Sequence, residues 1–117
     1  MPTDDISRPT DRIGAAAAGT WTLGGHTVRR LGFGSMRLTV DPDPARALRR
    51  AAELGVNHID TAAFYVSPGG TLDVGTAPKR YAVELIRSAL WPYPEELLIA
   101  SKVGPGEQGW TRGASRA

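Results

Sequence analysis

Segments with the pattern of β-strands alternate with segments that have the pattern of α-helices along most of this chain. Strand-like runs occupy residues 30–34, 56–61 and 97–103, and helix-like runs occupy residues 44–54 and 78–90. A helix therefore separates each strand from the next, which is the connection that two parallel neighbouring strands require. The order therefore predicts an α/β fold with about three parallel strands and two helices, joined by crossovers that are almost always right-handed.

Two glycines predict an antiparallel hairpin ahead of the first parallel strand. Residues 20–28 hold two short strand-like pieces on either side of Gly24 and Gly25. Paired glycines readily adopt the positive φ angles of a two-residue hairpin turn. The residues before the hairpin, 1–19, are rich in Pro, Asp, Thr and Ala, and we interpret them as a disordered leader. Residues 106–117 have no hydrophobic periodicity and are interpreted as an irregular tail.

The first helix carries its own start and stop signals. Asp43 suits the N-cap position and Pro44 the first helical turn. Gly55 suits the left-handed conformation that ends a helix. The second helix is followed by Pro92 and Pro94, which cannot continue it. Each helix has one apolar face, formed by Ala47, Leu48, Ala51 and Leu54 in the first and by Ala82, Leu85, Ile86, Ala89 and Leu90 in the second.

The composition excludes several classes of function. The chain has no cysteine, so disulfides, thiol catalysis and cysteine metal sites are ruled out. His26 and His58 lack metal-ligand spacing, and no metal is predicted. No apolar run approaches the roughly 18 residues that span a bilayer. The N-terminus does not have the pattern of a secretory signal, so we expect the cytoplasm. Basic and acidic residues are interleaved and the formal net charge is +2, which argues against nucleic-acid binding.

Polar and reactive side chains follow each of the predicted parallel strands. Residues 34–37 follow the first strand, Asp60 and Thr61 end the second with Tyr65 in the loop beyond, and Lys102 ends the third. In parallel α/β folds the functional residues lie at these carboxyl ends, along one edge of the sheet. We therefore expect these residues to form the candidate site.

Asp60, Tyr65 and Lys102 together suggest proton transfer. The second and third strands are predicted neighbours, about 4.8 Å apart, so the carboxylate and the ammonium would emerge on one rim. Tyr65, five positions after Asp60, can fold over that rim. A nearby cation favours the phenolate form of a tyrosine, which helps its hydroxyl to donate a proton to a carbonyl oxygen. The hydride that must reach the carbonyl carbon has to come from a cofactor, because no side chain supplies one.

Each of these residues also has an ordinary structural interpretation. Asp60 could cap or turn the chain, Tyr65 could pack on a helix, and Lys102 could be solvated. The glycines that begin at Gly32 do not complete a dinucleotide-binding fingerprint, because Arg37 stands where the third glycine would be. No single residue therefore decides the function.

Three longer stretches carry a resemblance to a known family. They are residues 31–38 (LGFGSMRL), 51–62 (AAELGVNHIDTA) and 98–104 (LIASKVG), with residues 84–90 (ELIRSAL) between the last two. Together they resemble the N-terminal portion of the aldo/keto reductase family. The likeness extends over about residues 20–105, which we take as the folded domain.

The resemblance implies a partial (β/α)₈ TIM barrel whose hairpin closes the bottom. It implies binding of NADPH, with NADH possible, and reduction of a small-molecule carbonyl substrate, an aldehyde or a ketone. It also implies that Tyr65 is the proton donor, that Lys102 is the cation that tunes it, and that Asp60 holds the lysine near the nicotinamide. The implied cofactor contacts are Gly34, Ser35, Met36, Arg37 and Asp60.

Several features depart from the family pattern. A complete barrel needs about 250 residues, whereas this chain has 117, so we expect a truncated and inactive fragment. No histidine follows His58 to match the family's fourth catalytic residue at the end of strand four. The loop after Tyr65 is longer than usual, and Val66 stands where a glycine is common. Two alternatives stay open: a small non-catalytic α/β binding module, and one part of a barrel that another chain completes. Open sheet edges would also permit self-association.

Overall fold

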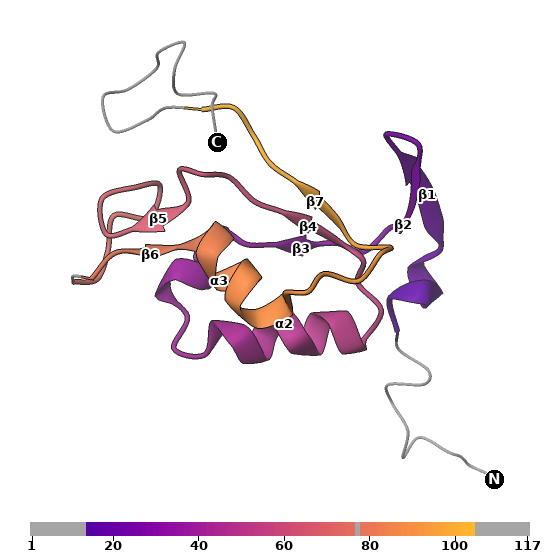
Figure 1. The fold of residues 1–117 in the computed structure, drawn as a ribbon, viewed down its shortest axis with the longest axis horizontal. Coiled ribbons are helices and arrows are strands. Elements are labelled where there is room, and N and C mark those ends of the chain that lie inside the picture. Colours follow the sequence, from indigo (N-terminus) through magenta and orange to yellow (C-terminus); the bar gives the residue numbers. More distant parts are fainter. Residues whose placement is uncertain (1–13, 77, 105–117) are drawn as a thin grey trace, which may run out of the picture.

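A three-stranded parallel sheet forms the centre of the molecule (Figure 1). The computed structural model describes residues 14–76 and 78–104. The strand order is β3 (Phe33–Gly34), β4 (His58–Asp60), β7 (Leu98–Ala100), and both neighbouring pairs are parallel. The predicted α/β order with parallel strands is confirmed. Within the described residues the strands form an open sheet, with no closed barrel.

The register places the ends of the three strands side by side. Gly34 pairs with Asp60, and Asp60 pairs with Ala100. The paired strands are two or three residues long, which is shorter than the runs that the sequence predicts. Because the last residues of the three strands are aligned, the residues that follow each strand leave the sheet at one common edge.

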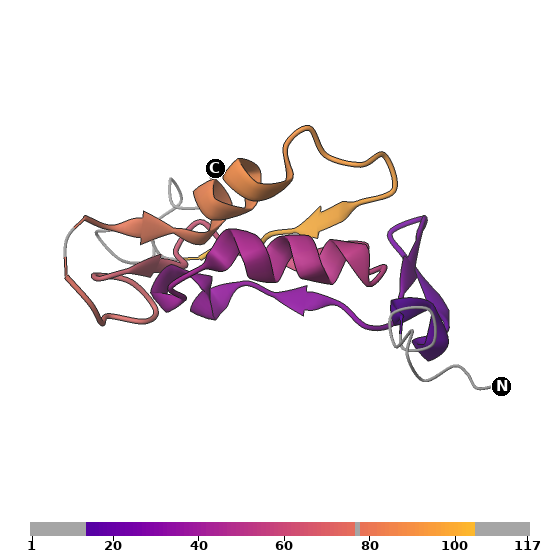
Figure 2. The same cartoon turned by 90° about the horizontal axis from the view of Figure 1, so that it is seen from below.

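Both helices cover the same face of this sheet (Figures 1 and 2). They are α2 (Pro44–Glu53) and α3 (Ala82–Leu90). One buried cluster joins Leu48 of α2 and Ile86 of α3 to Ile59 of β4. Residues of the outer two strands, Phe33 and Ile99, pack against this cluster. Burial of these apolar side chains, each worth about 1.5–3 kcal/mol, holds the helices on the sheet.

The predicted signals at the ends of the first helix are confirmed. The Asp43 side chain accepts a hydrogen bond from the Arg46 backbone N–H at 3.3 Å, and Pro44 opens the helix. Gly55 follows the helix with a φ angle of +95°, the left-handed conformation that glycine tolerates best.

The second helix starts later than predicted. We expected residues 78–90 to be helical, but α3 begins only at Ala82. The preceding residues are extended, because β6 (Arg80–Tyr81) pairs with β5 (Val66–Ser67) in an antiparallel hairpin. No local sequence pattern predicts this pairing, which joins Val66 to Tyr81 and Ser67 to Arg80.

The N-terminal hairpin matches its prediction. Strands β1 (Thr20–Leu23) and β2 (His26–Arg29) are antiparallel, and the two turn residues, Gly24 and Gly25, have φ angles of +57° and +82°. Both glycines therefore occupy the left-handed region that a primed turn requires.

The expected disordered leader needs a correction at its C-terminal end. The 3₁₀ helix η2 (Ala15–Ala18) is packed on the domain, since Ala15 is buried and its N–H donates to the Leu54 carbonyl at 2.7 Å. Residues 1–13 and the predicted tail, 106–117, lie outside the described residues. No helix in the described part of the chain is long and apolar enough to cross a bilayer.

Candidate active site

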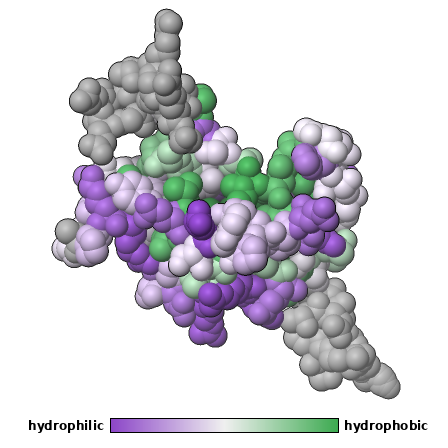
Figure 3. Space-filling view, viewed as in Figure 1, coloured by the Kyte–Doolittle hydropathy of each residue, from purple (hydrophilic) through white to green (hydrophobic). Residues whose placement is uncertain are grey.

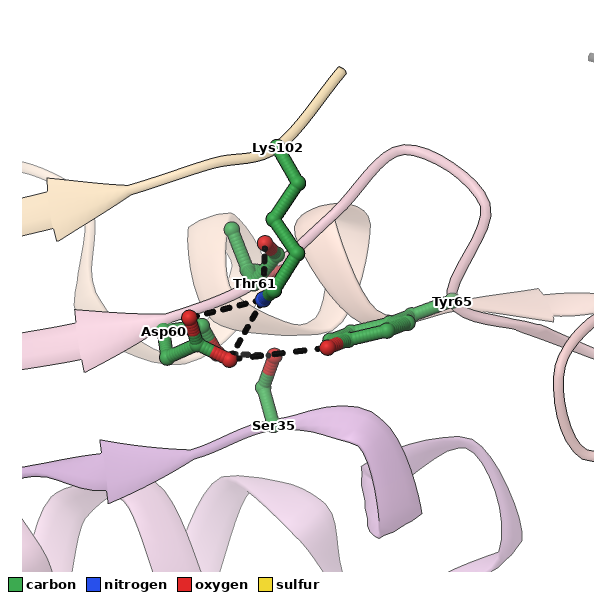
Figure 4. A network of polar contacts seen from close by, with 5 residues as sticks. All are labelled: Ser35, Asp60, Thr61, Tyr65 and Lys102. Carbon is green, nitrogen blue, oxygen red and sulfur yellow. Dashed lines mark hydrogen bonds and ion pairs between the residues drawn. The ribbon is translucent and has the colours of Figure 1, made fainter. Parts of the chain in front are cut away.

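Three chain segments bring the predicted site residues to one edge of the sheet (Figure 4). Asp60 is the last residue of β4, and Lys102 lies two positions beyond β7. The Thr61 N–H donates to the Ala100 carbonyl at 2.8 Å, which keeps the two outgoing segments adjacent. The Tyr65 N–H donates to the Ala62 carbonyl at 3.1 Å, closing a turn after β4. This turn folds the Tyr65 side chain back toward the edge of the sheet at which β4 ends.

The predicted contact between Asp60 and Lys102 is present. Lys102 Nζ lies 2.7 Å from Oδ1 and 2.6 Å from Oδ2 of Asp60, and it also donates to the Thr61 carbonyl at 3.2 Å. The three acceptors match the three protons of the ammonium group. Sequence reasoning missed the part played by Thr61, because a backbone carbonyl carries no residue-type signal.

The hydroxyl of Tyr65 points toward this ion pair (Figure 4). Its hydroxyl is 3.5 Å from Asp60 Oδ2, which is the outer limit of a hydrogen bond, and its side chain is largely buried. Lys102 Nζ lies 4.8 Å from the centroid of the tyrosine ring. The cation therefore stands over the ring face, where the ring quadrupole attracts it, and the hydroxyl is only weakly engaged.

The surroundings of Lys102 keep it charged. Partial burial by itself lowers the pKa of Lys102, but the hydrogen bonds and charge interactions with Asp60 and Tyr65 outweigh this and raise the pKa above its usual 10.5. The Lys102 and Asp60 side chains remain 39% and 52% exposed. Such an exposed pair contributes little to stability, so its main consequence is a fixed positive charge beside the phenol.

The loop after β3 reaches the same edge, with one correction. Gly34, Met36 and Arg37 are exposed there, and no atom would lie within 4 Å of a Cβ atom placed on Gly34. Ser35, which we expected to meet the cofactor, is fully buried. Its N–H and its Oγ both donate to the Asp60 carbonyl, at 3.0 and 2.8 Å. The serine side chain therefore fastens β3 to the end of β4 and leaves no surface for a cofactor.

The exposed part of this edge places apolar and polar groups side by side. It offers open space beside Gly34, the apolar side chain of Met36 and the half-exposed carboxylate of Asp60. A flat, partly polar ring needs this combination of apolar surface and a few polar groups. Within residues 14–76 and 78–104 no cluster of three His, Cys, Asp or Glu side chains could hold a metal ion.

Comparison with known proteins assigns the chain to a family. The model of the aldo/keto reductase family matches residues 17–117. The chain belongs to the aldo/keto reductase family. It is 39% identical over 97 residues to pyridoxine 4-dehydrogenase of Escherichia coli (strain K12), an alignment that covers 75% of this chain and 30% of that protein. It is 36% identical over 104 residues to an aldo-keto reductase of Mycobacterium tuberculosis, covering 88% of this chain and 32% of that protein.

The relatives place this aldo/keto reductase chain among oxidoreductases. A third relative, an uncharacterized oxidoreductase of Schizosaccharomyces pombe, is 38% identical over 101 residues, with 79% of this chain and 29% of that protein covered. The chain thus spans about a third of the length of the curated relatives that it matches. The open three-stranded sheet is consistent with part of the barrel of this family.

Proposed function

We propose that this chain supplies the proton-donating part of the active site of a nicotinamide-dependent carbonyl reductase. One observation carries the proposal: the Tyr65 hydroxyl, the Lys102 ammonium and the Asp60 carboxylate share one rim of a parallel sheet. Family membership supports it, since the matched relatives include a dehydrogenase and reductases by name. The proposed substrate is a small aldehyde or ketone.

The three side chains divide the proton chemistry between them. Tyr65 donates its phenolic proton to the carbonyl oxygen of the substrate, so that the oxygen becomes the hydroxyl of the alcohol. The phenolate that is left is stabilised by the ammonium of Lys102, which stands 4.8 Å from the ring centroid. Asp60 holds that ammonium in place through two short contacts. A bound nicotinamide supplies the hydride that reduces the carbonyl carbon.

The proposed cofactor is NADPH, with NADH as the alternative. Gly34, Met36, Arg37 and Asp60 would hold its nicotinamide end at the rim. These residues would face the nicotinamide and not the 2′-phosphate that distinguishes the two dinucleotides, so they would not choose between them. We therefore propose to test both.

We also propose that turnover requires the remaining strands of a barrel, either from the same protein or from a second chain. The sheet has two outer strands, β3 and β7, each with one neighbour within the described residues. The isolated 117-residue chain is expected to oxidise neither NADPH nor NADH with any aldehyde. Robust turnover by the purified monomer would contradict this part of the proposal.

A chimera tests the proposed role of Tyr65. Residues 14–104 would replace the matched segment of the Escherichia coli relative, and oxidation of NADPH and NADH would be followed with a panel of aldehydes. Pyridoxine with the oxidised cofactors would be included, because that relative is named a pyridoxine 4-dehydrogenase. We expect Tyr65→Phe to lower kcat by about 10²–10⁴-fold, the usual contribution of a general acid.

A matched tyrosine serves as the control. Tyr93 meets Trp91 edge to face, with ring centroids 5.1 Å apart, and does not take part in the candidate site, so Tyr93→Phe is expected to leave kcat unchanged. An active chimera that keeps its full rate after Tyr65→Phe would overturn the assignment. A sharply unfolding, monomeric chain without redox activity in any combination would favour a non-catalytic binding module.

A further inference from the structure

The segment that carries Lys102 leaves the sheet before it reaches the lysine. The hydrogen bond from the Thr61 N–H attaches it at Ala100, and the next three residues, 101–103, are exposed. The ion pair with Asp60 is half exposed, and pairs of this kind fix a backbone only weakly. Another contact must therefore define where this segment runs.

Gly104 provides that contact by lying directly on an aromatic ring. It is buried, in contrast to the three exposed residues before it. A Cβ atom on Gly104 would come within 2.9 Å of three atoms of the Phe64 ring. The φ angle of Gly104 is not in the left-handed region, so its backbone conformation does not require glycine. The requirement comes from the close approach of the ring, which leaves no room for a methyl group.

The same ring packs against the proposed proton donor. Phe64 and Tyr65 meet edge to face, with ring centroids 5.4 Å apart and an interplanar angle of 84°. Phe64 also packs on the buried cluster of Ala62, Tyr65 and Ala82. One phenylalanine ring therefore contacts both the chain two residues beyond Lys102 and the tyrosine over which the lysine ammonium lies.

We propose that Gly104 and Phe64 are positioning residues, whose contact sets the separation between the Lys102 ammonium and the Tyr65 ring. This inference rests on the proposed function, which gives Tyr65 and Lys102 their roles. The contact completes a closed circuit of four residues. Lys102 lies two positions before Gly104, which packs on Phe64. Phe64 directly precedes Tyr65, and the ring of Tyr65 lies under the Lys102 ammonium. A shift of the segment after β7 would then move the cation away from the phenol.

The test introduces a methyl group at the contact and then makes room for it. In the full 117-residue chain, at a dilution where it is monomeric, Lys102 ε-protons are expected to resonate upfield because they lie near the face of the Tyr65 ring. Gly104→Ala is expected to abolish this upfield shift and to lower the pKa of Lys102 toward its ordinary value. Adding Phe64→Leu, which removes the ring edge but keeps an apolar side chain, is expected to restore both.

Val103→Ala is the control within the same segment. Val103 is 70% exposed, so its truncation is expected to change neither the resonance nor the pKa of Lys102. The proposal is overturned if Gly104→Ala leaves both readouts unchanged. It is also overturned if the double variant, Gly104→Ala with Phe64→Leu, stays unfolded or keeps the altered resonance and pKa of Lys102. Removing the clash should restore the fold and both readouts.

A kinetic measurement separates this inference from the proposed function. In the active chimera, Gly104→Ala is expected to lower kcat about 10²-fold, the order of loss known for displacements of about 1 Å, with little change in the KM of the cofactor. Inactivity of every chimera would contradict the proposed function. The resonance and the pKa of Lys102 would still decide the positioning contact, since neither depends on turnover.

Discussion

At the scale of single residues, the candidate site depends on where one charged group stands. Lys102 donates to both oxygens of Asp60 and to the Thr61 carbonyl, and its Nζ lies over the ring of Tyr65. The Tyr65 hydroxyl donates to Asp60 Oδ2 only at 3.5 Å, the outer limit of a hydrogen bond, so a substrate carbonyl could compete for the phenolic proton. Asp60 contacts both other groups of the candidate site, because its two oxygens lie 2.7 and 2.6 Å from Lys102 Nζ and one of them lies 3.5 Å from the Tyr65 hydroxyl.

The raised pKa of Lys102 predicts a pH dependence of stability. A group whose pKa is higher in the folded state contributes stability that is fully present below its unfolded pKa of about 10.5 and is lost as the pH rises through the folded value. The free energy of unfolding of the native chain should therefore fall more steeply above about pH 10.5 than that of a Lys102→Gln variant. The difference is expected to be small because Lys102 is 39% exposed.

Urea denaturation at about pH 9 and at about pH 11.5 measures this difference, since one value lies below and the other above the pH range in which Lys102 loses its proton. Lys79→Gln is the matched control, because that lysine is exposed and lies outside the candidate site. Equal pH dependence in the native chain and in Lys102→Gln would contradict the ion pair that the structure shows.

At the scale of elements, the two helices show which helix ends a local sequence pattern can predict and which it cannot. The first helix begins and ends where its local signals place it, because Asp43 and Gly55 act within one turn of the helix end. The start of α3 is instead set by a partner far along the chain. Arg80 and Tyr81 are extended because Val66 and Ser67 pair with them, and the Ala82 N–H donates to the Tyr65 carbonyl at 2.9 Å. This last bond ties the helix start to the candidate site.

The cap of α2 gives a prediction at this scale. Replacing the capping side chain, Asp43→Ala, should lower the free energy of unfolding by about 1 kcal/mol, because an N–H group at the helix start loses its acceptor. Asp43→Asn keeps an oxygen in the capping position and is expected to cost much less. Thermal or urea unfolding of the two variants checks the difference. Equal losses would show that the charge of Asp43, and not its hydrogen bond, stabilises the helix.

At the scale of the whole molecule, the sheet has unpaired edges and several large apolar side chains are exposed within the described residues. The outer strands β3 and β7 each pair on one side only. Hydrophilic residues cover the outer face of α2, whereas hydrophobic side chains are exposed near the strands (Figure 3). The exposed large hydrophobic residues of the described chain are Trp21, Leu23, Leu31, Met36, Val74, Val83, Trp91 and Val103. Unpaired strand edges beside exposed apolar surface favour association with other chains.

We therefore predict that the 117-residue chain associates with itself. Sedimentation velocity should show an apparent mass that rises with concentration, because each open strand edge can pair with another copy. Mixing the chain with a polypeptide that carries the remaining strands of a related barrel should suppress this association. A single monomeric species at all concentrations, with one sharp unfolding transition, would contradict the prediction.

Sequence alone determined the features that depend on neighbouring residues or on one repeating pattern. The alternation of strands and helices, the Gly24-Gly25 turn and the Asp43 cap follow from local backbone preferences, and the meeting of Asp60 with Lys102 follows from the parallel order of the strands. Tertiary structure alone decided the late start of α3, the burial of Ser35 and the packing of Gly104 on Phe64. These three depend on contacts between residues distant in the chain, which act only after the strands have been brought together.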